Sequence, residues 1–158
     1  MSNNKREITL RFLASPIDVN FGGKIHGGSA MKWLDEAGYT CATAWSGTYC
    51  VTVFVGDINF NNPISVGDLV EINAKIIYTG KSSMHIFMEL SSGNPKQSDL
   101  TKSMRCLMVF VAVDENRQPV EVPAWHPVSD SDIAMEKYTH RIMELRKVNQ
   151  ENLNSFFE

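Results

Sequence analysis

Four segments between residues 50 and 113 have the apolar, β-branched or alternating character of strands and are separated only by short turns or loops. They cover residues 50–58, 69–78, 84–90 and 101–113. The segment 69–78 repeats with the period of two that is typical of a β-strand. The segment 101–113 is nearly all apolar in its second half, as expected for a central strand buried on both faces. Because the connections are too short for parallel crossovers, the sequence predicts an antiparallel sheet.

One long helix is predicted before these strands, from Ser29 to about Ser46, where Ser46-Gly47 ends it. Small residues border its apolar stripe and allow the helix to lie close to its neighbour. With a short strand predicted over 7–13, we expect an α+β fold in which a curved antiparallel sheet wraps around this helix. The helix is apolar over most of its circumference, so exposed apolar surface and open sheet edges predict dimerisation. The stripe recurs at spacings of three and four and consists of Met31, Leu34, Gly38, Cys41 and Trp45.

A second helix is predicted from about Asp130 to Asn149, with Ser129 or Asp130 as its N-cap. We therefore expect one domain over 1–128 and a C-terminal helical extension over 129–158. The modest apolar stripe of this helix suits packing on the domain or on a neighbouring subunit. We interpret it as an element that stabilises an oligomer, so that deleting residues 129–158 would lower the assembly state.

Charge and cysteine content narrow the class of protein. A net charge of -3 argues against a nucleic-acid partner, which usually requires a basic excess. No apolar run approaches the roughly 20 residues of a membrane helix, and no signal peptide is visible at the N-terminus. Three cysteines without close pairs form neither a disulfide framework nor a zinc site. We expect a cytoplasmic, reduced protein without a metal.

The most specific motif is the stretch NFGGKIHGGSAMKWLDEAG at 20–38, where a glycine-rich loop leads directly into the long helix. Its Asn, its glycines and its Met-x-x-x-Asp helix resemble the hotdog-fold acyl-CoA thioesterases, in particular the acyl-CoA hydrolase branch. The resemblance covers roughly residues 7–125 and includes FVAVDENRQPVEVP at 110–123. It departs from the family pattern at Arg117, where relatives often carry glycine. The residues that carry the motif are Asn20, Gly22, Gly27, Gly28, Met31 and Asp35.

The resemblance implies hydrolysis of acyl-CoA to a carboxylic acid and CoA. A backbone N–H at a helix N-terminus stabilises negative charge on a thioester oxygen, and we assign this role to Gly28. Asp35 lies seven residues further along, on the same helix face, and would act as general base or as nucleophile. Asn20 would orient the water or the thioester and, by the resemblance, would come from the opposite subunit. A dimer with shared sites is then obligatory, and relatives suggest a trimer of dimers.

No cofactor is expected, because CoA is part of the substrate. Its phosphates require cationic or backbone N–H partners, and the turn Gly80-Lys81-Ser82 is the best candidate, with Arg105 as a weaker one. We place Gly27 and His26 at the edge of the substrate site. No Rossmann or P-loop pattern is present.

Other interpretations of these residues stay open from sequence alone. A hotdog hydratase or dehydratase would use His26 as its base, and a silent acyl-CoA-binding module would bind without turnover. Asp35 would be an ordinary exposed helix residue if it paired with Lys32 or Tyr39, and Asn20 would be a plain turn residue if it only shaped the loop. Glu36 is rotated about 100° from Asp35 and should face elsewhere. The acyl chain length is not encoded in any pattern we find.

Overall fold

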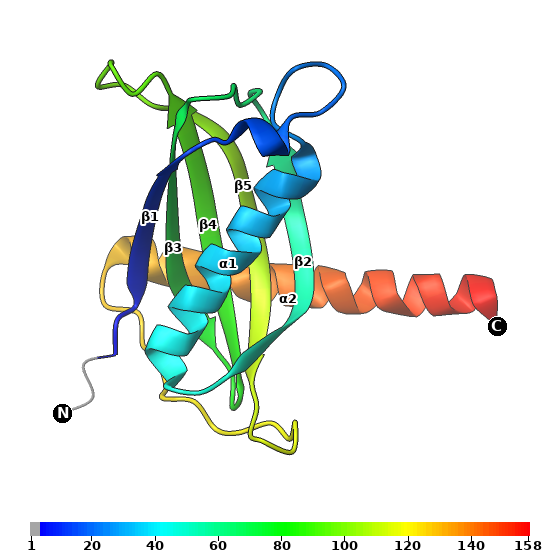
Figure 1. The fold of residues 1–158 in the computed structure, drawn as a ribbon. Coiled ribbons are helices and arrows are strands. Elements are labelled where there is room, and N and C mark those ends of the chain that lie inside the picture. The colour runs from blue at the N-terminus through cyan, green and yellow to red at the C-terminus, as the bar shows by residue number, and fades with distance from the viewer. Residues whose placement is uncertain (1–3) are drawn as a thin grey trace.

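Five strands form one antiparallel sheet in the order β1-β3-β4-β5-β2, as the computed structural model of residues 4–158 shows (Figure 1). The strands are β1 (Glu7–Leu13), β2 (Cys50–Phe60), β3 (Leu69–Thr79), β4 (Ser83–Gly93) and β5 (Thr101–Ala112). The predicted strands and their antiparallel pairing are confirmed. β1 and β2 are the two edges, and β2 is bent by register shifts after Thr52 and after Gly56.

Helix α1 (Gly27–Ser46) lies across one face of this sheet (Figure 1). The core between them contains the inward side chains of β3, β4 and β5, among them Ile72, Met88 and Phe110. An added Cβ at Gly38 would lie 2.7 Å from the Phe110 ring, so this glycine permits the close approach of helix and sheet. The buried stripe of α1 differs partly from the prediction, since Met31 is exposed and Trp45 is only half-buried. It consists of Ala30, Trp33, Leu34, Ala37, Gly38, Cys41 and Ala42.

The ends of α1 show one difference from the sequence prediction. The helix begins at Gly27, so the glycine pair forms its first turn instead of preceding it. The reason is the N-cap residue, His26, whose side chain satisfies a backbone N–H of that turn. At the other end Gly47 adopts the left-handed conformation with φ 73°, which glycine accommodates without strain. The predicted end at Ser46 is therefore confirmed.

Helix α2 (Asp130–Phe157) crosses the opposite face of the sheet (Figure 1). Ser129 caps it in a capping box with Asp132, as one of the two predicted caps. Arg6, close to β1, forms an ion pair with Asp132 at 2.6 Å and anchors the helix start. The predicted end at Asn149 is wrong by two turns, because residues 150–157 contain no Gly or Pro to stop the helix. These last turns extend beyond the edge of the sheet (Figure 1).

β5 is buried on both faces, as its apolar sequence predicted. Met104, Cys106 and Met108 belong to the core under α1, whereas Leu107 and Val109 alternate with them along the strand and are buried on its other face. The sheet therefore has an inner face toward α1 and an outer face toward α2. No helix among residues 4–158 is long and apolar enough to span a membrane.

Candidate functional site

Asp35 lies near the middle of α1, on the side of the helix that faces edge strand β2. Its Oδ1 atom accepts a hydrogen bond from Thr52 Oγ1 at 2.6 Å. The carboxylate is exposed in the single chain. Asp35 does not pair with Lys32, whose Nζ atom instead lies 3.9 Å from Glu36 Oε1. Asp35 is thus a carboxylate oriented by a single hydroxyl on a neighbouring strand.

Thr52 is the neighbour of Asp35 that sequence reasoning missed. A threonine in a β-strand is ordinary, and no spacing connects it to Asp35, which lies 17 residues earlier. The contact depends on where β2 runs beside α1 and on the register shift that follows Thr52. No local signal could have identified it.

Asn20 shapes the loop that leads into α1. Its side-chain Oδ1 accepts hydrogen bonds from the N–H groups of Gly22 at 2.8 Å and Lys24 at 3.2 Å. Its backbone N–H donates to the Lys24 carbonyl at 2.7 Å, and the loop is closed by a bridge between Val19 and Ile25. Asn20 therefore does shape the turn, as one of the two interpretations of this residue predicted. Its side-chain NH₂ forms no hydrogen bond among residues 4–158 and is the only part of the amide free to contact a substrate.

The first turn of α1 is closed by His26. The Gly28 N–H donates to His26 Nδ1 at 3.0 Å, and the His26 N–H donates to the Asp18 carbonyl at 2.6 Å. The N–H that we had assigned to the thioester oxygen is therefore used within the chain. A pocket of about 250 Å³ opens beside this turn, lined by Gly27 and Ala30 on one side and by Phe60 on the other.

The candidate CoA-binding turn lies at the other end of the sheet. Residues 80–82 connect β3 to β4, and α1 begins at the opposite end (Figure 1). Lys81 is exposed, and its backbone carbonyl accepts from the Val122 N–H at 2.9 Å. Within one chain the structure therefore does not bring Gly80, Lys81 and Ser82 together with Gly27 and Gly28.

Arg105 is also separate from Asp35, because it lies on the outer face of β5. It neighbours the hydrogen bond that Tyr138 of α2 donates to Asp57 of β2. Burial, reinforced by Asp57, raises the pKa of Tyr138 to about 12. Asp57 has a φ of 57°, and this irregular stretch of β2 places its carboxylate against the helix. Arg105 therefore belongs to the contact between α2 and the sheet.

No cluster of residues suited to a metal occurs in the described part of the chain, 4–158. Cys41, Cys50 and Cys106 are buried and unpaired. Burial raises the pKa of Cys41, with a further contribution from Glu7, and that of Cys106, each to about 12. Thiols held in the protonated form are poor nucleophiles, so Cys41 and Cys106 are not suited to attack a thioester.

The chain is similar to known thioesterases. Residues 22–98 match the family model described as the thioesterase superfamily. The acyl-CoA thioester hydrolase YciA of Salmonella typhimurium is 32% identical over 120 residues, which are 74% of this chain and 90% of that protein. An uncharacterized acyl-CoA thioester hydrolase of Zymomonas mobilis is 31% identical over 131 residues, covering 83% and 86% of the two chains. A solved apo-hexameric acyl-CoA thioesterase, 26% identical, has a TM-score of 0.86, with 92% of this chain and 93% of that chain covered.

Proposed function

Since this chain belongs to the thioesterase superfamily and is an acyl-CoA hydrolase of the hotdog fold, we propose that Asp35 drives the hydrolysis of its acyl-CoA substrate. The observation that carries the assignment is the hydrogen bond from Thr52 to Asp35 at 2.6 Å. It fixes the carboxylate on a rigid helix while leaving the second oxygen free for a water or for the thioester carbon. The acid and CoA are the products.

Two mechanisms fit this carboxylate. As a general base, Asp35 takes a proton from water as the water oxygen attacks the thioester carbon, and the C–S bond then breaks to release the CoA thiol. As a nucleophile, it attacks the carbon itself, the C–S bond breaks to release CoA thiolate, and water then hydrolyses the mixed anhydride and restores the carboxylate. Gly28 lies seven residues earlier on the helix, about 10 Å along its axis. A water and a thioester group between them would bridge this separation.

The Gly28 N–H requires one rearrangement to serve as an oxyanion donor. It would have to exchange its bond to His26 Nδ1 for the developing charge on the substrate oxygen. An imidazole that accepts this N–H has only Nε2 left for a ligand, which weakens the hydratase alternative with His26 as base. We propose that His26 holds the N–H group in place until substrate binds.

We further propose that the site is shared between two subunits. The free edge of β2 and the exposed Tyr39, Val55 and Phe60 leave apolar surface next to Asp35 for a second copy. A similar solved thioesterase is hexameric, which supports a trimer of such dimers. In the dimer, Asn20 of one chain would contact the substrate at Asp35 of the other.

The decisive test is thiol release from acyl-CoAs of two to sixteen carbons, compared between wild type, Asp35→Asn and the control Glu36→Gln. We expect Asp35→Asn to lower kcat by roughly two orders of magnitude or more. Glu36→Gln, which changes the adjacent exposed carboxylate, should leave kcat within about twofold. Equal activity of Asp35→Asn and wild type would refute the assignment.

The shared site has its own test. Chains carrying Asn20→Ala and chains carrying Asp35→Asn are each expected to be inactive. If they are unfolded together and refolded as a mixture, half of the dimers are hybrids, and each hybrid has one intact site of two. Recovery of about a quarter of wild-type activity is expected for shared sites. A mixture as inactive as its components would place both residues in the same chain's site.

A further inference from the structure

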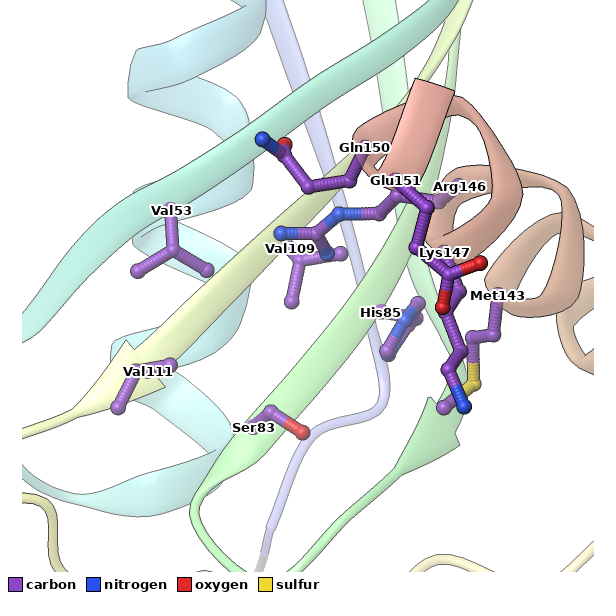
Figure 2. A pocket seen from close by; sticks show the side chains of 10 residues that line it. All are labelled: Val53, Ser83, His85, Val109, Val111, Met143, Arg146, Lys147, Gln150 and Glu151. Atoms are coloured by element: carbon purple, nitrogen blue, oxygen red, sulfur yellow. The ribbon is translucent and has the colours of Figure 1, made fainter. Parts of the chain in front are cut away.

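A groove of about 500 Å³ lies between the outer face of the sheet and the C-terminal half of α2 (Figure 2). We call it the outer groove. Its volume is within the range of about 300–1,000 Å³ that is usual for small-molecule sites. It lies on the opposite face of the sheet from α1, so it is distinct from the site around Asp35. The residues that define it are His85, Val109 and Val111 on the strands and Met143, Arg146 and Lys147 on the helix.

The floor of the outer groove is mostly apolar, and its polar groups are the imidazole of His85 and the hydroxyl of Ser83. Val109 and Val111 of β5 lie beside His85 of β4, and Met143 faces them from α2 (Figure 2). His85 is only 4% exposed, and its Nδ1 atom has no hydrogen-bond partner among residues 4–158. Because this nitrogen atom is itself buried, a ligand in the groove would lie against the valines and Met143 and not on the imidazole nitrogen.

The rim of the groove is positively charged. Arg146, Lys147 and Glu151 stand along it on α2, which gives two cations and one carboxylate (Figure 2). None of the ion pairs formed within residues 4–158 includes Arg146 or Lys147. Arg146 lies over the Phe54 ring at 4.2 Å, which leaves its N–H groups free. The rim therefore complements one negative charge and does not suit a polyphosphate.

We propose that the outer groove is a second ligand site, which binds an aliphatic monocarboxylate. The alkyl chain lies on the valines and Met143, where burial of its methylene groups supplies most of the affinity. The carboxylate lies at the rim, where Arg146 and Lys147 donate charge-assisted hydrogen bonds. The assignment does not depend on the role of Asp35, although an acid released by thioester hydrolysis belongs to the same chemical class.

The test is a calorimetric titration of the full-length Asp35→Asn chain with octanoate, in the presence of saturating CoA. Each chain should bind octanoate, and octanol and octylamine should bind at least tenfold more weakly because they lack the negative charge. Lys147→Gln should weaken octanoate roughly tenfold, whereas Lys137→Gln, on the same helix but outside the groove, should change nothing. Val111→Trp should abolish binding by filling the groove.

Two results would overturn the proposal. One is octanoate binding that is unaltered by both Lys147→Gln and Val111→Trp, because the ligand would then sit elsewhere. The other is absence of octanoate binding to the Asp35→Asn chain. If Val111→Trp then also gives a smaller assembly in analytical ultracentrifugation, the outer groove is a contact between copies of the chain. Lys147→Gln keeps the test decisive if Val111→Trp fails to fold, because it alters only a surface side chain.

Discussion

Single contacts decide the chemistry proposed for this protein. The Asp35 carboxylate and the Thr52 hydroxyl meet at 2.6 Å, and the bond uses one of the two carboxylate oxygens. A hydrogen bond to a charged group contributes about 1.5–3 kcal/mol. Its main effect here would be to hold the carboxylate in one rotamer, so that its free oxygen points at the same place in every molecule.

Replacing this hydroxyl tests that idea. Thr52→Val keeps the shape of the side chain and removes the donor, so kcat should fall by roughly one order of magnitude while KM stays nearly unchanged. The comparison is Thr48→Val, which removes a hydroxyl bonded only to its immediate neighbours. Steady-state kinetics of both variants, with melting temperatures to verify folding, measure the effect. A kcat equal to that of wild type would show that Asp35 does not need Thr52.

His85 makes folding stability depend on pH. Burial, followed by the charges of Arg146 and His140, lowers the pKa of this imidazole from 6.5 to about 4. Above pH 6.5 the residue is neutral in both the folded and the unfolded chain, and no stability is lost. As the pH falls from 6.5 to 4, only the unfolded chain takes up the proton. The free energy of unfolding should therefore decrease by up to roughly 3 kcal/mol.

Urea unfolding of wild type and of His85→Gln at pH 7 and pH 4 measures this loss of stability. His85→Gln removes the contribution of the imidazole and leaves the contributions of the other titrating groups. The loss of stability on acidification should be smaller in His85→Gln than in wild type by up to that amount. His126→Gln, which changes an exposed histidine, should lose as much as wild type. Equal losses in all three proteins would mean that His85 is protonated in the folded state.

At the scale of elements, the approach of α1 to the sheet organises the molecule. Gly38 faces Phe110 and Met88, and the helix positions both Asp35 and the Gly27-Gly28 turn relative to the strands. The helix propensity that glycine lacks relative to alanine, about 1 kcal/mol, is offset by the tighter packing it permits.

Gly38→Ala should therefore destabilise the protein despite the better helix propensity of alanine. The new methyl would lie 2.7 Å and 2.9 Å from Phe110 ring atoms, and overpacking of this kind typically costs about 1–3 kcal/mol. Chemical unfolding of Gly38→Ala, of Phe110→Leu and of the double variant gives the coupling between the two positions. The double variant should be more stable than the sum of the single effects predicts, and strict additivity would contradict the contact.

At the scale of the whole molecule, apolar surface remains uncovered where α2 extends beyond the sheet. Leu153 is 52% exposed, Phe156 85% and Phe157 84%. Large apolar side chains exposed together mark an interaction site more often than they occur on a free surface. If the C-terminal extension stabilises an oligomer, we therefore expect its last two turns to form the contact, because the first part of α2 already covers the outer face.

Deleting residues 152–158 should lower the assembly state and leave the fold intact. This truncation removes the exposed apolar residues but keeps the part of α2 that packs on the sheet, whereas deleting 129–158 would uncover Leu107 and Val109 as well. Sedimentation velocity measures the assembly, and far-ultraviolet circular dichroism verifies the fold. The double variant Phe156→Ser, Phe157→Ser should behave like the truncation. An unchanged oligomer in both would assign the assembly to other surfaces.

The sequence by itself determined the elements and the general architecture. Alternation over 69–78 and the spacings of three and four in the helix report local backbone conformation, because side-chain direction repeats every 2 residues in strands and every 3.6 in helices. Short connections then allow only antiparallel pairing. The glycine-rich loop with Asn20 and Asp35 supported the resemblance to acyl-CoA thioesterases for the same reason, since its spacing lies within one continuous segment.

Only the tertiary structure decided which side chains meet. Thr52 contacts Asp35 because β2 is an edge strand beside α1, and the outer groove exists because α2 crosses the outer face. The turn at Lys81 and the glycines of α1 lie at opposite ends of the sheet, which spacing along the chain could not reveal. Such contacts depend on strand order, register and helix placement, and these are set by packing between segments far apart in the sequence.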